Sequence, residues 1–371
     1  MTKARSIYIH FPFCETKCHY CDFYSLGVEK TKPNDPLLFL NSLLEEIQIK
    51  SKDIAPLIDT LFLGGGTPSM TSPSDMKKIF DSLWRFTKLS DSYEWTMEAN
   101  PSSIGKANVS AYSDIGVNRI SLGVQALRDA LLADLGRVHD TKSVFTALDS
   151  IFNSPIQNVS VDLLCGVPDQ SFDDIKNAID RLTQYPITHL SCYLLTLPKS
   201  HRMFKSLPND ELQQGILLLV HDELTKRGFT HYEISNFCKP GFEAKHNLSY
   251  WKNHSYLGFG PSAHSFDQEL GVRSKNVSSL HQYATKIKNG DSPVDHTESL
   301  SNSQKELEKW LLALRLSEGF PKKWISTENK IKNIEAFIKS GHIESHPANS
   351  SHYRLTPLGF TVSDSIILKL S

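Results

Sequence analysis

Short apolar runs recur along the first 200 residues, with amphipathic stretches between them. Each run is rich in β-branched or aromatic residues, as expected for strands that are buried on both faces. The predicted strands cover residues 6–11, 60–66, 94–100, 119–125, 158–166 and 189–197. Helices are predicted between them at 36–51, 73–88, 103–115 and 171–184. This alternation predicts an α/β fold with a parallel sheet and right-handed crossovers, and its six repeats indicate a partial (β/α)6 barrel.

The pattern changes after residue 200. A long helix is predicted over 209–227, because apolar positions repeat at helical spacing and Gly228 follows as a stop signal. A Gly-, Asn- and aromatic-rich stretch follows at 231–266, with an extra strand expected at HYEISNF. The C-terminal part predicts a small winged-helix-like α+β domain, with helices at 303–316, 329–340 and near 357–369 and a hairpin made by 341–345 and 352–356.

The polar, glycine-containing segment 288–300 is the predicted domain boundary. It divides the chain into a first domain over 1–290 and a second over 300–371. The second domain has no concentrated basic stripe, since its Lys and Arg alternate with Glu, Asp and Ser. We therefore expect no nucleic-acid binding despite the winged-helix-like pattern.

Composition and charge exclude several classes of protein. The 371 residues include 40 Lys+Arg and 41 Asp+Glu, a net charge of −1, which does not favour a strongly basic nucleic-acid binder. No run of eighteen apolar residues predicts a transmembrane helix, and the N-terminus lacks the apolar region of a secretory signal. We therefore expect a cytoplasmic protein in a reducing compartment.

Three of the six cysteines crowd into one loop directly after the first predicted strand. Cys14, Cys18 and Cys21 form a C-x3-C-x2-C pattern that can place three thiolates around one metal centre. Zinc is one interpretation, with His10 or His19 as a fourth ligand. An iron–sulfur cluster with one iron open to a small molecule is another. The three remaining cysteines are expected to be buried apolar residues, and they are Cys165, Cys192 and Cys238.

Polar or glycine residues stand at the ends of four successive predicted strands. The second strand ends in Gly64-Gly65-Gly66-Thr67-Pro68, where glycine lets the backbone approach a ligand closely. Glu98, Gln125 and Asp162 lie on the third, fourth and fifth strands. Sites of α/β barrels form at the carboxyl ends of their strands, so we expect one shared pocket that also includes the cysteine loop. Asp162 could instead cap buried backbone amides.

These motifs together resemble the radical S-adenosylmethionine (SAM) superfamily, and the whole chain is similar to its oxygen-independent coproporphyrinogen III oxidase group. The resemblance implies that Cys14, Cys18 and Cys21 hold a [4Fe–4S] cluster whose open iron takes the amino and carboxylate groups of SAM. It also implies a SAM-contacting set made of Tyr8, Tyr20, Gly65, Gly66, Thr67, Glu98, Gln125, Arg137 and Asp162. Residues 1–290 would then form the radical SAM barrel.

Two features separate subfamilies within this group. The oxidases have a fourth cysteine two residues after the third, where this chain has Phe23, and they carry an extension before the cluster loop. The motif His246-Asn247-Leu248-Ser249-Tyr250-Trp251 resembles the haem-binding signature of the haem chaperones in the same group. This resemblance implies a haem-binding segment over 231–266, with His246 as axial ligand. His264 is the weaker alternative and is expected to be a structural histidine.

The sequence therefore predicts a haem chaperone that binds a [4Fe–4S] cluster, SAM and haem and transfers haem to an acceptor protein, with an electron donor protein as a further partner. The competing hypothesis is a coproporphyrinogen III oxidase, which would remove CO₂ from propionate side chains by radical chemistry in porphyrin biosynthesis. Phe23 and the HNLSYW motif favour the chaperone. No catalytic residue is assigned, and a zinc-binding structural module is the third hypothesis.

Overall fold

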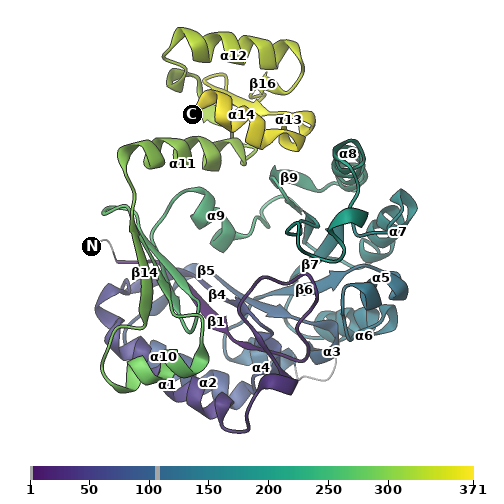
Figure 1. The fold of residues 1–371 in the computed structure, drawn as a ribbon. Coiled ribbons are helices and arrows are strands. Elements are labelled where there is room, and N and C mark those ends of the chain that lie inside the picture. Colours follow the sequence, from purple (N-terminus) through teal and green to yellow (C-terminus); the bar gives the residue numbers. More distant parts are fainter. Residues whose placement is uncertain (1–2, 105–108) are drawn as a thin grey trace. The chain divides into compact units, whose positions relative to one another are not determined.

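The computed structural model describes residues 3–104 and 109–371, which form two compact units (Figure 1). The first unit contains the described residues up to Asp162, together with Ala244–Tyr250 and His254–Ser299. The second unit contains Leu163–Glu243, Trp251–Asn253 and Leu300–Ser371. The predicted division into 1–290 and 300–371 stays a prediction.

All six predicted strands form. They are β1 (Ser6–Phe11), β4 (Leu57–Gly65), β5 (Lys88–Ala99), β6 (Arg119–Gln125), β7 (Asn158–Cys165) and β8 (His189–Leu194). Most of their apolar side chains are fully buried, as the continuous apolar runs predicted. The α/β class of a partial barrel is therefore confirmed.

The parallel register of the first unit aligns the carboxyl ends of its strands. β1 pairs in parallel with β4, and Phe11 at the end of β1 lies opposite Gly65. β4 in turn pairs with β5, and β5 with β6, both in parallel. The loop after β1 and the turn after β4 consequently begin at the same edge of the sheet, which brings two distant sequence motifs together.

On its other side β1 pairs in parallel with a strand that the sequence did not predict. This strand, β11 (Tyr256–Phe259), leads into three antiparallel neighbours, β12 (His264–Asp267), β13 (Val272–Asn276) and β14 (Val294–Ser299). β14 lies inside segment 288–300, the predicted domain boundary, where the sequence did not predict a strand. Its polar residues are compatible with an edge strand because its side chains are largely exposed.

Helices form in the first unit at the predicted segments 36–51 and 73–88, although the second helix ends at Leu83. α1 (Asp35–Ile49) lies beside α10 (Leu280–Lys288), and α2 (Pro73–Leu83) begins at Ser72, whose hydroxyl accepts the Asp75 N–H (Figure 1). The helix predicted over 103–115 lies partly outside the described residues; α3 (Pro101–Ile104) and α4 (Val109–Asp114) flank that gap. α5 (Asp129–Asp134) and α6 (Thr141–Phe152) were not predicted.

The second unit contains the helices and strands of residues 163–243 and those of the C-terminal segment 300–371. α7 (Phe172–Leu182) and α8 (Asp210–Lys226) pack together, and β10 (Asn236–Cys238) pairs antiparallel with both β8 and β9 (Thr230–Glu233). The extra strand expected at HYEISNF is therefore a short hairpin. α8 stops where Gly228 adopts a positive φ of 75°, as the sequence predicted.

The C-terminal chain forms the expected winged-helix-like arrangement. A three-stranded antiparallel sheet has the order β15 (Phe320–Pro321), β17 (His352–Leu355), β16 (Ile343–Ser345). Its helices are α11 (Asn302–Leu314), α12 (Glu328–Lys339), α13 (Pro357–Thr361) and α14 (Ser363–Leu370). Trp310, Phe320 and Ile366 lie at the centre of their shared apolar core. Within the described part of the chain, no helix has the length and apolar character needed to cross a membrane.

Candidate functional site

The glycine turn after β4 is hydrogen-bonded to the backbone at the start of the cysteine loop. The Gly66 N–H donates to the Phe11 carbonyl at 2.6 Å, and the Thr67 N–H donates to the Phe13 carbonyl at 2.7 Å. A Cβ on Gly66 would lie 2.5 Å from the Phe13 oxygen, which is too close for any other residue. Glycine at this position therefore permits the two backbones to touch, as the sequence indicated.

The His10 ring packs against Gly65 in the glycine turn. Gly65 has a φ of +100°, and a Cβ there would lie 2.5 Å from the His10 ring. Both ring nitrogens of His10 have partners, the Tyr8 hydroxyl at 3.0 Å and the Tyr24 carbonyl at 2.7 Å. Burial lowers the pKa of His10 to about 4, so the ring is neutral. Because both ring nitrogens of His10 are hydrogen-bonded, the ring is not available in this conformation as the zinc ligand that the sequence analysis considered.

The three loop cysteines lie near one another at this edge. Cys14 belongs to the two-residue strand β2 (Phe13–Cys14), which pairs with β3 (Leu26–Gly27), while Cys18 and Cys21 follow in the loop. Burial raises the pKa of Cys14 and of Cys21, and each is raised further by the Cys18 thiol. Thiols that affect one another's ionisation are close neighbours.

Two donors are directed at these sulfur atoms. The Thr67 hydroxyl donates to Cys14 Sγ at 3.6 Å, and Arg137 Nη1 donates to Cys18 Sγ at 3.5 Å. The Thr67 contact lowers the pKa of the Cys14 thiol, and both donors would stabilise a thiolate, the form that binds metals. Across the ranges 3–104 and 109–371, no three His, Cys, Asp or Glu side chains are arranged to ligate one ion. Ligands of a multi-iron cluster bind different iron atoms and are spaced more widely.

Asn100 joins the glycine turn to Arg137, a link that the sequence reasoning missed. Its Nδ2 donates to Thr67 Oγ1 at 3.0 Å, and its Oδ1 accepts from Arg137 Nη2 at 2.7 Å. The same nitrogen of Arg137 donates to the Gly123 carbonyl at 2.6 Å. Burial lowers the pKa of Arg137, but the neighbouring Tyr20 and Cys18 raise it above its ordinary value, so it stays a cation. The spacing could have indicated Asn100, because it follows Glu98 by two positions at the end of the predicted strand, and alternate residues of a strand point to the same face.

Glu98 and Asp162 are two partly buried acidic residues of the first unit whose charges interact. Glu98 Oε2 accepts the Gly65 N–H at 3.1 Å, and both Asp162 oxygens lie 3.1 Å from the Ser121 hydroxyl that donates to them. Burial, followed by the charge of Asp162, raises the pKa of Glu98 to about 8. This carboxyl group is therefore protonated near neutral pH unless a cation approaches it.

Gln125 and Tyr8 complete the set of residues expected at this edge. Gln125 adopts a φ of +67°, unusual for a residue with a side chain, and a Cβ on Gly123 would lie 3.0 Å from its Nε2. Burial raises the pKa of Tyr8, and Glu98 contributes to that rise, which places the phenol beside the acidic pair. All the expected SAM-contacting residues consequently belong to the first unit.

His246 lies in α9 (Lys245–Trp251) and is fully enclosed by protein, with 1% of its surface exposed. Nδ1 lies 2.7 Å from the Thr60 hydroxyl and Nε2 lies 2.6 Å from the Tyr250 hydroxyl. The His246 N–H donates to Glu94 at 3.0 Å, and the ring stacks on Phe62. Burial lowers the pKa of His246 to about 3. Neither ring nitrogen is open to a metal in this conformation, which the motif alone did not indicate.

Three further sets of residues can be located in the structure. His264 is exposed on β12, and its structural role stays a prediction. Phe23, at the position of the oxidases' fourth cysteine, is 67% exposed. The remaining cysteines are buried as expected, and they are Cys165, Cys192 and Cys238.

Comparisons with known proteins identify the family of this chain. Residues 8–182 match the Radical SAM superfamily. The chain is 37% identical over 328 residues to the protein named "Heme chaperone HemW" of Bacillus subtilis, covering 86% of this chain and 85% of that protein. It is 30% identical over 373 residues to the protein of the same name from Mycobacterium tuberculosis H37Rv, covering 98% and 94%.

A solved structure shows the same fold. Coproporphyrinogen III oxidase (HemN) from Escherichia coli, described as a radical SAM enzyme, superimposes with a TM-score of 0.83 at 19% identity, covering 100% of this chain and 90% of that one. At this level of sequence identity, the likeness shows a shared fold and does not show a shared activity. From the level of sequence identity and its extent, the chain belongs to the heme chaperone HemW family of the radical SAM superfamily.

Proposed function

We propose that this protein binds a [4Fe–4S] cluster, SAM and haem, and that it transfers haem to an acceptor protein. The observation that best supports this proposal is the continuous contact from the cysteine loop through Arg137 and Asn100 to Thr67. It ties the cluster loop and the glycine turn into one site. The names of the relatives support the haem-transfer part.

In the proposed site, Cys14, Cys18 and Cys21 hold the cluster. The bound cluster would supply an open iron and one-electron chemistry. Thr67 and Arg137 would stabilise thiolate charge, since they already donate to Cys14 and Cys18. Arg137 would also contribute a partly buried positive charge beside an iron–sulfur centre that is expected to be anionic.

The proposed SAM site uses the residues around the glycine turn. The Gly66 and Thr67 N–H groups already bond to the loop, so contacts there would use carbonyl oxygens and the Thr67 hydroxyl. Glu98 is a suitable partner for an ammonium group, because a nearby cation would lower its raised pKa and restore its charge. Asp162 and Gln125 offer acceptors for ribose hydroxyls, while Tyr8 and Tyr20 flank the site.

Haem binding at His246 requires a local rearrangement. Nε2 would have to give up the Tyr250 hydroxyl, or Nδ1 the Thr60 hydroxyl, before either could ligate iron. His246 therefore enters the proposal as a ligand of an opened conformation of α9. The electron donor, the haem acceptor and a cytoplasmic location belong to the same proposal.

An anaerobic assay separates the chaperone from the oxidase. The cluster-reconstituted protein is incubated with SAM, reductant and coproporphyrinogen III, and a parallel sample is titrated with haem. We expect stoichiometric haem binding and no protoporphyrinogen IX. Multiple turnovers to protoporphyrinogen IX would instead identify an oxidase, and an absence of saturable haem binding would contradict the chaperone. A triple alanine variant of the loop cysteines should lose iron and sulfide.

A further inference from the structure

Arg119 is a buried cation of the first unit that the proposed cluster and SAM sites do not use. It is the first residue of β6, and only 2% of its surface is exposed. Its Nη1 donates to the Thr96 hydroxyl at 3.4 Å, while its buried Nε has no hydrogen-bond partner within the described chain. No carboxylate within residues 3–104 and 109–371 forms an ion pair with it. Because burying a charge without a partner is costly, this arrangement favours an anion supplied by a ligand.

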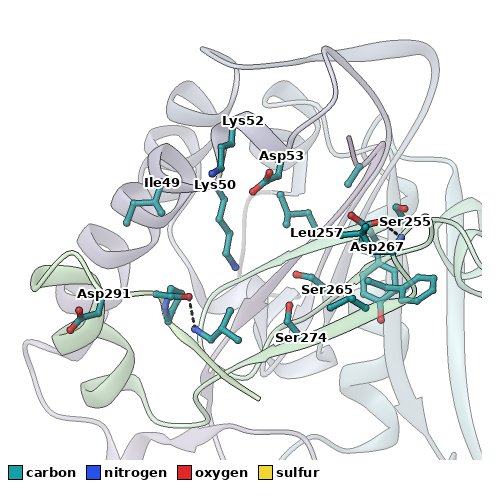
Figure 2. Close-up of a pocket in the computed structure, with 18 of the residues that line it drawn as sticks. Ile49, Lys50, Lys52, Asp53, Ser255, Leu257, Ser265, Asp267, Ser274 and Asp291 are labelled. Carbon is teal, nitrogen blue, oxygen red and sulfur yellow. Dashed lines mark hydrogen bonds between the residues drawn. The ribbon is translucent and has the colours of Figure 1, made fainter. Parts of the chain in front are cut away.

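Lys50, by contrast, is a cation of the same unit whose ammonium group is fully paired. It reaches toward strands β11–β14 at a cavity of about 480 Å³ that lies between these strands and the end of α1 (Figure 2). Its ammonium group contacts Glu46 at 2.6 Å, the Gly258 carbonyl at 3.0 Å and Asn276 at 3.4 Å. These contacts use all three N–H donors, so Lys50 offers no free charge to a ligand in that cavity.

Arg119 lies at one end of a row of side chains that crosses four neighbouring strands, β1, β4, β5 and β6 (Figure 1). The parallel register aligns one residue from each strand, in the order Tyr8, Phe62, Thr96 and Arg119. Residues in register on neighbouring strands point to the same face of a sheet and are about 4.8 Å apart. The Tyr8 and Phe62 rings stack at a centroid distance of 6.1 Å. The row therefore has two aromatic rings at one end and a positive charge at the other.

His246 of α9 is stacked on this row. Its ring lies on the Phe62 ring at a centroid distance of 5.1 Å. Thr96, which accepts a hydrogen bond from Arg119, donates one to Glu94 at 3.4 Å, and Glu94 accepts the backbone N–H of the histidine at 3.0 Å. The ring beneath the candidate axial ligand and the unpaired cation are thus two strands apart, or about 10 Å, on one face of the sheet.

The two acidic residues on either side of Thr96 along β5 do not neutralise Arg119. Glu94 accepts two backbone N–H groups at the start of α9, one on each carboxylate oxygen. Burial raises the pKa of Glu98 to about 8, so this carboxyl group is protonated near neutral pH. A ligand carboxylate would therefore meet a guanidinium whose charge the described chain leaves unpaired.

The carboxylate of SAM does not suit this position. It is expected on the open iron of the cluster, at the carboxyl ends of the strands, whereas Arg119 begins its strand. Gln125 ends the same strand, about 20 Å away. Haem, the remaining proposed ligand, carries propionate carboxylates at the edge of its macrocycle, and these would extend outward from an iron held by His246.

We propose that Arg119 binds a propionate carboxylate of haem when His246 ligates the iron, with the Phe62 ring packing against the macrocycle. This inference rests on the proposed haem-binding function and names the group that recognises the carboxylates. It uses the same opened conformation of α9, because His246 lies on Phe62 in this structure. Arginine binds carboxylates through parallel N–H groups, and the unpaired Nε supplies one of them.

The test uses the full-length, cluster-reconstituted protein, titrated anaerobically with haem and with haem dimethyl ester, which lacks free carboxylates. We expect wild type to bind haem about tenfold or more tightly than the ester, the effect of one charge-assisted hydrogen bond. Arg119→Met should bind haem as weakly as wild type binds the ester, and its affinity for the ester should equal that of wild type. Arg119→Lys should keep part of the preference because it keeps the charge.

Arg273→Gln is the matched control. Arg273 is also a partly buried arginine of the first unit, and its guanidinium lies over the Phe266 ring at 5.6 Å. This variant should keep the wild-type preference for haem over the ester. The Soret maximum of bound haem should be unchanged in Arg119→Met, because the axial ligand is intact, and shifted in His246→Ala. Unchanged cluster absorbance and SAM affinity would show that the variants fold.

The proposal is overturned if Arg119→Met keeps the wild-type preference for haem over its ester, since the cation would then have a structural role alone. Equal affinities of wild type for haem and the ester would also overturn it. If Arg119→Met does not fold, Arg119→Gln provides a second substitution for the same comparison. If wild type binds neither compound, the proposed function fails as well, so the two failures are distinguishable.

Discussion

Glu98 on β5 accepts the backbone N–H of Gly65 on β4 at 3.1 Å, so a partly buried carboxyl group is held directly against the glycine turn. The contact brings together two motifs that lie 33 residues apart in the sequence. It also gives the turn an acidic partner whose charge depends on what binds nearby.

The ionisation of this carboxyl group gives a first prediction. Because burial and Asp162 raise the pKa of Glu98 to about 8, a protonated carboxyl band in infrared difference spectra should titrate with that midpoint in the absence of SAM. Glu98→Gln should remove the band. Asp162→Asn should lower the midpoint, since it removes a negative charge. A midpoint near the usual value of glutamate in the wild type would contradict this interpretation.

The same shift predicts the pH dependence of stability. Glu98 is protonated in the folded state up to about pH 8 but ionises near its ordinary pKa when unfolded. Its contribution to the free energy of unfolding therefore falls as pH rises from about 4.5 to 8, by up to about 1.4 kcal/mol per pH unit. Urea unfolding of wild type and Glu98→Gln at several pH values should show this slope only in the wild type. Parallel pH profiles would count against it.

The glycine turn gives a second prediction, in which Gly65→Ala lowers both stability and SAM affinity. The alanine Cβ would lie 2.5 Å from the His10 ring at a φ of +100°. Gly290→Ala is the matched control, because Gly290 also has a positive φ of 76° but has no atom within 4 Å of that position. We expect a loss of about 1–2 kcal/mol for the control from backbone strain, and more for Gly65→Ala.

Calorimetry with SAM distinguishes the two variants further. Gly65→Ala should lower SAM affinity at least tenfold, whereas Gly290→Ala should leave it unchanged. Equal SAM affinity in both variants would remove the glycine turn from the proposed site.

A third prediction concerns Asn100, which connects Thr67 to Arg137. Asn100→Ala should destabilise the protein by about 1–3 kcal/mol and accelerate loss of iron on exposure to oxygen, because Arg137 loses a partner beside Cys18. Asn118 is a suitable control, since its amide also makes two bonds, to the Trp95 N–H and the Tyr93 carbonyl, away from the cysteines. Asn118→Ala should lose stability without losing iron faster. Equal iron loss in both variants would show a general effect of destabilisation.

The fourth prediction addresses His246. Tyr250→Phe removes the hydroxyl group 2.6 Å from Nε2 and so frees that nitrogen. If His246 ligates haem in an opened conformation of α9, this variant should bind haem several-fold more tightly. Thr60→Val removes the hydroxyl group at Nδ1, so any change in its haem affinity reports on that nitrogen. The Soret maximum and haem Kd measure the effect. Unchanged haem binding in Tyr250→Phe, together with unchanged binding in His246→Ala, would assign the residue a structural role alone.

Much of the fold and of the candidate site could be predicted because the signals are local. Strand β1 and strand β6 begin and end at the predicted residues, since continuous apolar runs leave little freedom in a buried parallel sheet. β14 was missed because an edge strand needs no apolar face. Asn100 was missed because its importance comes from the Thr67 and Arg137 side chains, which are distant in sequence.

The sequence by itself determined the α/β class, the cysteine loop and the strand-end residues, because spacing and periodicity record which side chains share an edge. Only the tertiary structure decided how each of them is used. It showed that both ring nitrogens of His246 are bonded and that the His10 ring packs against Gly65. The physical reason is that burial and hydrogen bonding determine which ring nitrogens of a histidine are protonated and which are open to a ligand. Burial and hydrogen bonding depend on neighbours that are distant in the sequence.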